Sequence, residues 1–105
     1  MRDFMGMMKQ AAQLQSKMQE MQAELDTIEV EGVAGGGMVA VTLTAKGALK
    51  GVRIDDSLMQ PSEKEIVEDL LVTAHADARR KAEAVLAEKM KAVTGGLPIP
   101  PGLLG

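Results

Sequence analysis

The side chains that could do acid–base, nucleophilic or metal chemistry are few and scattered along this 105-residue sequence. His75 is the only histidine, and a metal site needs several ligands at regular spacing, so a structural or surface role is favoured. Asp55 and Asp56 are a possible carboxylate pair, but they follow a predicted strand and precede Pro61, which favours a loop. No serine has a base at a recognisable spacing, and cysteine is absent. The sequence therefore predicts no catalytic site, no enzyme activity, no metal and no cofactor.

The run Gly35-Gly36-Gly37 is the other feature that could bind a ligand, because glycine-rich loops can cradle phosphates. It lacks the Lys-Ser/Thr pair of a phosphate-binding loop, and it precedes a predicted strand rather than a helix. We therefore expect this run to form a turn between strands.

The basic residues offer a different chemistry, the binding of a polyanion such as a nucleic acid. The net charge is -3, but residues 20–31 and 55–69 are acidic whereas residues 1–19 and 78–91 are basic. If two helices carry these segments away from the same side of a sheet, their basic ends meet at a distal tip. Alternatively, the charges are solvated helix faces that keep the protein soluble, and the pI of about 5.1 is low for a DNA-binding domain.

Long helices must position these charges, and the first 28 residues contain the clearest one. Apolar residues recur there at alternating spacings of three and four, which keeps them on one side of a helix. A stripe of this length requires a partner, either another helix of the chain or a second copy. The stripe consists of Phe4, Met7, Ala11, Leu14, Met18, Met21, Leu25 and Ile28.

Strand patterns fill residues 28–55, between the two helical segments. Apolar residues alternate there with small or polar ones, and Lys46-Gly47 is typical of a tight hairpin connection. The sequence predicts about three short strands with one apolar face to cover. The residues of that face are Val39, Val41, Leu43, Val52 and Ile54.

A second helix is predicted to begin after Ser62, the expected N-cap, with Glu65 completing a capping box. Alanines in its apolar stripe would allow another element to approach closely. We expect one domain over residues 1–94. The Gly/Pro/Leu-rich tail over residues 95–105 is expected to be disordered or to dock on a partner as an extended strap.

The predicted fold is α+β in the order α-β-β-β-α, with a small antiparallel sheet and two long helices. Thirty residues of helix span about 45 Å and a six-residue strand about 20 Å, so the helices project beyond the sheet or bend back on it. One aromatic residue and nine methionines leave few large core anchors, which favours a second subunit. No apolar run approaches the roughly 20 residues of a membrane span, and no signal-peptide pattern is present, so we expect a cytoplasmic protein without a membrane partner.

Three separated motifs resemble signatures of the YbaB/EbfC nucleoid-associated proteins. The first covers residues 31–39 (EGVAGGGMV), and the second covers residues 52–55 (VRID) followed by residues 57–58 (SL). The third covers residues 68–74 (EDLLVTA) and leads into residues 78–82 (ARRKA). The Met/Gln-rich first helix and the tail also resemble the family, so the resemblance extends over nearly the whole chain.

The resemblance implies a homodimer in which strands of two subunits build a joint sheet and the long helices project like tweezers. It also implies binding of double-stranded DNA with little sequence preference in the bacterial nucleoid, with effects on DNA conformation, nucleoid organisation and gene expression. The family supplies no strict contact motif, so charge and position predict the DNA-binding residues: Arg2, Lys9, Lys17, Arg79, Arg80, Lys81, Lys89 and Lys91. The predicted dimer interface is the apolar sheet face of Val39, Val41, Leu43, Val52 and Ile54.

A second function class stays open, a helical clamp that binds other proteins as a scaffold or chaperone-like dimer. The Met-rich helices support this hypothesis, since methionine surfaces accept varied partners. DNA binding predicts an affinity that falls steeply with salt, whereas a protein clamp predicts co-purifying protein and salt-tolerant binding.

Overall fold

The computed structural model describes residues 2–94 and confirms the order of elements expected from the sequence. The tail expected at residues 95–105 lies outside the described residues. Two short 3-10 turns separate the sheet from the second long helix. The elements are α1 (Arg2–Thr27), β1 (Glu29–Ala34), β2 (Val39–Thr44), β3 (Leu49–Ile54), the 3-10 turns Asp56–Leu58 and Pro61–Glu63, and α2 (Lys64–Thr94).

The three strands form an antiparallel sheet in the order β1-β2-β3. Residues 35–37, between β1 and β2, all adopt positive φ angles that glycine tolerates, which confirms the predicted turn. The register places Gly32 opposite Val41, and Val41 opposite Val52. These three residues therefore lie on one face of the sheet.

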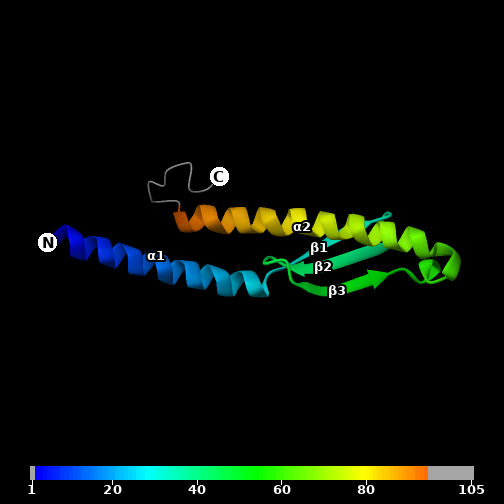
Figure 1. The fold of residues 1–105 in the computed structure, drawn as a ribbon, viewed down its shortest axis with the longest axis horizontal. Coiled ribbons are helices and arrows are strands. Elements are labelled where there is room, and N and C mark those ends of the chain that lie inside the picture. The colour runs from blue at the N-terminus through cyan, green and yellow to red at the C-terminus, as the bar shows by residue number, and fades with distance from the viewer. Residues whose placement is uncertain (1, 95–105) are drawn as a thin grey trace.

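The molecule is a rod of 72 × 24 × 16 Å, and α2 runs along much of its length (Figure 1). The sheet lies against the first half of α2, and α1 runs antiparallel to α2 near its second half (Figure 1). Helix α1 begins and α2 ends at the same end of the rod, as expected for helices that leave one side of the sheet. We call this the distal end. There, α1 extends beyond the last residue of α2 (Figure 1).

The main core lies between α2 and the sheet, where alanines of the helix meet apolar residues of β2. Gly32 of β1 lies directly under the helix. A Cβ built at this position would be 2.2 Å from both the Ala74 carbonyl oxygen and the Ala78 nitrogen, so only glycine allows this approach. The buried residues of this core are Ala34, Val39, Val41, Leu43, Leu58, Ala74 and Ala78.

A second, smaller core attaches the C-terminal part of α1 to the second half of α2. Met21 and Leu25 of α1 are buried there together with Ala45, which follows β2. The partly buried residues packed around them are Met18, Ile28, Val85, Met90 and Val93. This core fixes only the end of α1 that joins the sheet.

Within the described residues, α2 covers part of the apolar stripe of α1, and a second copy as the partner of the rest stays a prediction. Phe4 and Met7 are each 66% exposed, and Leu14 is half-buried. The cause is the length of the second helix, because α2 ends at Thr94 before it reaches the first turns of α1 (Figure 1).

The predicted N-cap of α2 at Ser62 is wrong. Gln60 is the extended residue that precedes the first turn, Pro61 begins a 3-10 turn, and α2 starts at Lys64. Proline is favoured at the first position of a helical turn because its φ angle is already fixed there. Ser62 therefore lies inside the turn, whereas an N-cap residue must be extended.

Candidate nucleic-acid interface

The basic residues of α2 do not all lie at the distal end, where the charge pattern placed them. Residues 79–81 directly follow Ala78, whose backbone packs against Gly32 of β1, so this basic triplet lies beside the sheet. Lys89 and Lys91 belong to the later turns of α2, nearer the distal end. The triplet lies there because α2 packs its first half on the sheet, and its second half extends past the strands.

Two of the lysines predicted to contact DNA are engaged within the protein itself. Lys81 Nζ donates a 2.7 Å hydrogen bond to the Glu31 carbonyl oxygen of β1 and lies 3.3 Å from Asp77 Oδ2. Lys89 Nζ lies 2.6 Å from Glu24 Oε2 and so links α2 to α1. A DNA phosphate would have to compete with these partners, which makes Lys81 and Lys89 the weaker candidates.

Arg79 and Arg80 have exposed guanidinium groups, and among the described residues their ion pairs are with neighbours on α2. Arg79 Nη2 lies 3.5 Å from Glu83 Oε1, and Arg80 Nη2 lies 3.0 Å from Asp77 Oδ1. Exposed ion pairs of this kind contribute about 0–1 kcal/mol to stability. A phosphate can therefore replace either carboxylate at small cost, and both arginines remain candidates for DNA contact.

Lys9, Lys17 and Lys91 lie toward the distal end, and we call them the distal lysines. All three are exposed, and none has an ion pair among the residues that the structure describes. Lys17 lines a shallow groove between α1 and the end of α2, and Lys9 lies about two turns further out on α1. Arg2 is the first residue of α1, but its side chain lies outside what the structure describes.

Two side chains of α2 cover the outer edge of β1. Asp77 Oδ2 accepts a 3.0 Å hydrogen bond from the Val33 N–H, and Lys81 Nζ donates to the Glu31 carbonyl oxygen. The hydrogen bond from Val33 is the main cause that lowers the pKa of Asp77 below 3.8. Partial burial of the carboxylate opposes this shift, whereas Lys81 and, to a smaller extent, Arg80 lower the pKa further. Because an open strand edge invites pairing with another chain, these contacts obstruct pairing at β1.

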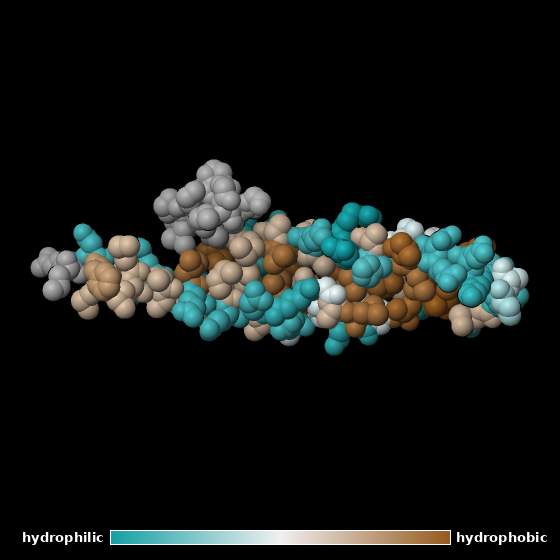
Figure 2. Space-filling view, viewed as in Figure 1, coloured by the Kyte–Doolittle hydropathy of each residue, from teal (hydrophilic) through white to brown (hydrophobic). Residues whose placement is uncertain are grey.

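The opposite edge of the sheet, β3, is far less covered by the helix. Helix α2 packs across β1 and β2, and Leu49 and Val52 of β3 remain 62% and 47% exposed. The register pairs Leu49 with Leu43 and Val52 with Val41, so both lie on the apolar face of the sheet. Figure 2 shows hydrophobic side chains gathered over the sheet region of the rod.

The residues predicted to form the dimer interface share one sheet face but differ in exposure. Val39, Val41 and Leu43 are at most 2% exposed, in the core beneath α2, and offer no surface to a second chain. Val52 remains about half-exposed on β3, and Ile54 is half-buried. The sequence indicated the face but not which of its strands α2 would cover.

The other side chains considered for chemistry do not form a site. His75 is exposed on α2. Asp55 accepts hydrogen bonds from the hydroxyl and from the backbone N–H of Ser57. The bond from the hydroxyl is the main cause that lowers the pKa of Asp55, and the bond from the backbone N–H caps the 3-10 turn Asp56–Leu58. Within residues 2–94, no group of three or more histidine, cysteine or acidic side chains could hold a metal ion. Neither described helix is long and apolar enough to cross a membrane.

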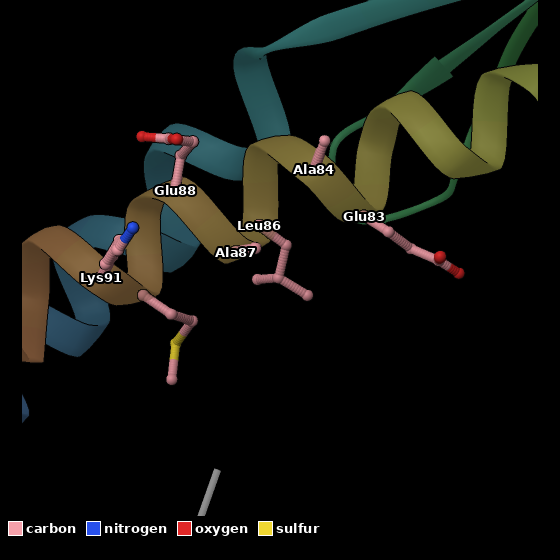
Figure 3. Close-up of a pocket in the computed structure, with 7 residues that line it drawn as sticks. Glu83, Ala84, Leu86, Ala87, Glu88 and Lys91 are labelled. Atoms are coloured by element: carbon pink, nitrogen blue, oxygen red, sulfur yellow. The ribbon is translucent and has the colours of Figure 1, made fainter. Parts of the chain in front are cut away.

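An open hollow lies on the second half of α2, and all of its described lining residues come from that one helix (Figure 3). Glu83 and Glu88 point to opposite sides of the helix in this view. Lys91 is the remaining charged residue of the lining. Because the described side chains do not converge on a common point, the hollow has no arrangement suited to catalysis.

The fold and the charges together define an extended α+β protein that presents cations on two helices at one end. The model of the YbaB/EbfC DNA-binding family matches residues 1–97. The chain therefore belongs to this family of bacterial nucleoid-associated, DNA-binding proteins, and the resemblance found in its motifs is confirmed.

Relatives and a solved structure resemble the chain over nearly its full length. It is 70% identical over 102 residues to Nucleoid-associated protein BRADO0764 of Bradyrhizobium sp. (strain ORS 278), covering 97% of this chain and 96% of the relative. It is 67% identical over 105 residues to Nucleoid-associated protein bll8115 of Bradyrhizobium diazoefficiens, covering 100% and 99%. The crystal structure of uncharacterized protein HP0035 from Helicobacter pylori matches with a TM-score of 0.69 and 23% identity over 94% of each chain, which concerns the fold alone.

Proposed function

We propose that this protein binds double-stranded DNA as a homodimer, with little sequence specificity, and acts in the nucleoid of the bacterial cytoplasm. The observation that carries the proposal is the set of three distal lysines, which are exposed and without ion pairs among the described residues. Membership of a DNA-binding family and relatives named nucleoid-associated protein support the same function.

Phosphate contact is the chemistry that these side chains can supply. Lysine ammonium groups bind phosphate oxygens, and such contacts provide position and affinity but little sequence information. Each neutralised phosphate releases counterions, so the affinity should fall steeply with salt. A dimer would hold the duplex at two separate ends and could change its conformation between them, which adds a weak preference for deformable sequences. Effects on nucleoid organisation and gene expression would follow from that change in DNA conformation.

We further propose that the two subunits meet at β3. Its edge is largely uncovered by α2, whereas Asp77 and Lys81 occupy the edge of β1. Pairing two β3 strands would continue the sheet from one subunit to the next and would bury Leu49 and Val52 of both. In this arrangement, the buried residues of β2 support the interface from within each subunit.

The first experiment is a fluorescence-anisotropy titration of a labelled duplex at several salt concentrations, with the mass of the free protein measured by light scattering. We expect a dimer whose affinity falls steeply with salt. The variant Lys9→Gln/Lys17→Gln removes four cations per dimer and should make the salt slope shallower by about 4 if each contacts a phosphate. The matched control Lys46→Gln/Lys64→Gln changes the net charge equally, away from the distal end, and should keep the slope.

Equal effects of the two double variants would show that net charge alone matters and would overturn the proposed contact surface. Absence of binding at low salt by a folded dimer would overturn DNA binding itself. The helical clamp would then be the better hypothesis, because the exposed Phe4 and Met7 give α1 an apolar surface. Co-purifying protein and salt-tolerant binding would support that alternative.

A further inference from the structure

The apolar stripe of α1 continues past the point where its cover by α2 ends. Met21 and Leu25 are buried in the second core, whereas Phe4 and Met7 on the same stripe are each 66% exposed. Figure 1 shows the cause, because α2 stops while α1 continues toward the distal end. In Figure 2 this end of α1 is largely tan, the colour of moderately hydrophobic residues. The uncovered stripe is thus the continuation of an interface that the protein already forms.

We propose that residues 95–105 of the same chain cover this stripe as an extended strap. Helix α2 runs antiparallel to α1 toward the distal end, so the segment that follows Thr94 starts where the cover by α2 stops. Ala92 and Val93 line the same groove as Lys17 of α1, which fixes the level on α1 at which the segment begins.

The length of the segment matches the stripe that needs cover. The stripe from Leu14 to Phe4 spans about 15 Å along the helix axis. Eleven extended residues reach roughly 35 Å, so the segment can turn at Gly95-Gly96 and still run along the whole stripe.

The composition of the segment favours it over a second copy of α1. It contains no charged side chain, and its prolines disfavour a helix and favour an extended strand. Its large apolar residues are Leu97, Ile99, Leu103 and Leu104. Two copies of the α1 tip would instead bring Lys9 and Lys17 of each close to those of the other, and like charges oppose such pairing.

The strap would cover the apolar side of α1 and leave its cations free. Lys9 lies about 160° around the helix from Met7, opposite the stripe. The covered helix could therefore still present Lys9 to a phosphate. The inference does not depend on DNA binding, and its test needs no DNA.

Methionine oxidation tests the strap with a reference inside the same helix. Met7 lies on the stripe, whereas Met5 lies off it and is 74% exposed. We would expose the full chain to hydrogen peroxide and follow both sulfoxides by peptide mass spectrometry. If the strap covers the stripe in nine of ten molecules, Met7 should oxidise about tenfold more slowly than Met5. Equal rates would overturn the proposal.

A variant of the segment shows which part of the chain provides the cover. Leu97→Ser/Ile99→Ser/Leu103→Ser/Leu104→Ser keeps the length and should raise the Met7 rate to that of Met5. The control Val72→Ser changes an apolar residue of α2 that is 71% exposed and should leave the ratio unchanged. Protection of Met7 that persists in the segment variant would overturn the proposal. A dependence of that persistent protection on protein concentration would identify a second copy as the cover.

Discussion

Replacement of Gly32 by alanine tests the closest contact between helix and sheet in this fold. The new Cβ would lie 2.2 Å from the Ala74 carbonyl oxygen and the Ala78 nitrogen, and 2.7 Å from the Ala78 Cα. Favourable non-bonded contacts need about 3.5 Å, so α2 and β1 would have to separate by roughly 1 Å. All three atoms belong to the backbone, so no side-chain rotation can relieve the clash.

The expected cost is about 3 kcal/mol, at the upper end of the range for overpacked cores. That cost is a large share of the roughly 5–15 kcal/mol by which folded domains are stable. For a chain of this length, each kcal/mol lowers Tm by about 4–8 °C, so Tm should fall by roughly 12–24 °C.

Thermal and urea unfolding followed by far-UV circular dichroism would measure this loss, since the chain has no tryptophan or tyrosine to report by fluorescence. Protein concentration must be held fixed, because the stability of a dimer depends on it. Gly51→Ala is the matched control, a strand glycine whose added Cβ would have nothing within 4 Å. Gly51→Ala should be neutral or stabilising by up to about 1 kcal/mol. Stabilities of the two variants within about 0.5 kcal/mol of each other would refute the close packing.

Three further predictions concern the β1 edge, the second core and the basic triplet. The carboxylate of Asp77 stabilises the fold above pH 3.8, and this contribution is lost as the pH falls through the lowered pKa of Asp77 in the folded state. The difference in unfolding free energy between the wild-type protein and Asp77→Asn, measured by urea titration, should therefore shrink in acid. Leu25 is 1% exposed, so Leu25→Ala should cost about 3 kcal/mol in urea unfolding, whereas the exposed Met5→Ala should cost less than about 0.5 kcal/mol. Arg79→Ala/Arg80→Ala/Lys81→Ala should weaken anisotropy-measured binding to all duplex sequences by similar factors. Unchanged affinity in a folded dimer would remove this triplet from the interface.

Local patterns predicted the elements well because they depend on residues close together in the sequence. Alternation of apolar and small residues indicated the strand that contains Val39, Val41 and Leu43 as β2, since side chains of a strand alternate between faces. The heptad stripe likewise predicted α1 to within about one residue at its end. The prediction of an N-cap at Ser62 was wrong because Pro61 begins a 3-10 turn one residue earlier, which places Ser62 inside that turn.

The candidate interface was less predictable, because a charge is free or engaged according to what packs beside it. Lys81, Lys89 and Lys91 occupy one basic segment of the sequence. The structure directs Lys81 to a β1 carbonyl and Lys89 to α1, and leaves Lys91 without an ion pair among the described residues. Nothing in the segment itself distinguishes the three.

By itself, the sequence determined the family, the order of elements, the apolar faces and the alternation of acidic and basic segments, since each of these is a property of neighbouring residues. Only the tertiary structure decided that α2 lies across β1 and β2 and leaves β3 largely uncovered. It also decided that α2 ends before the apolar stripe of α1 does. These outcomes follow from where elements far apart in the chain meet, above all at Gly32, where the absence of a side chain lets helix and strand backbones touch.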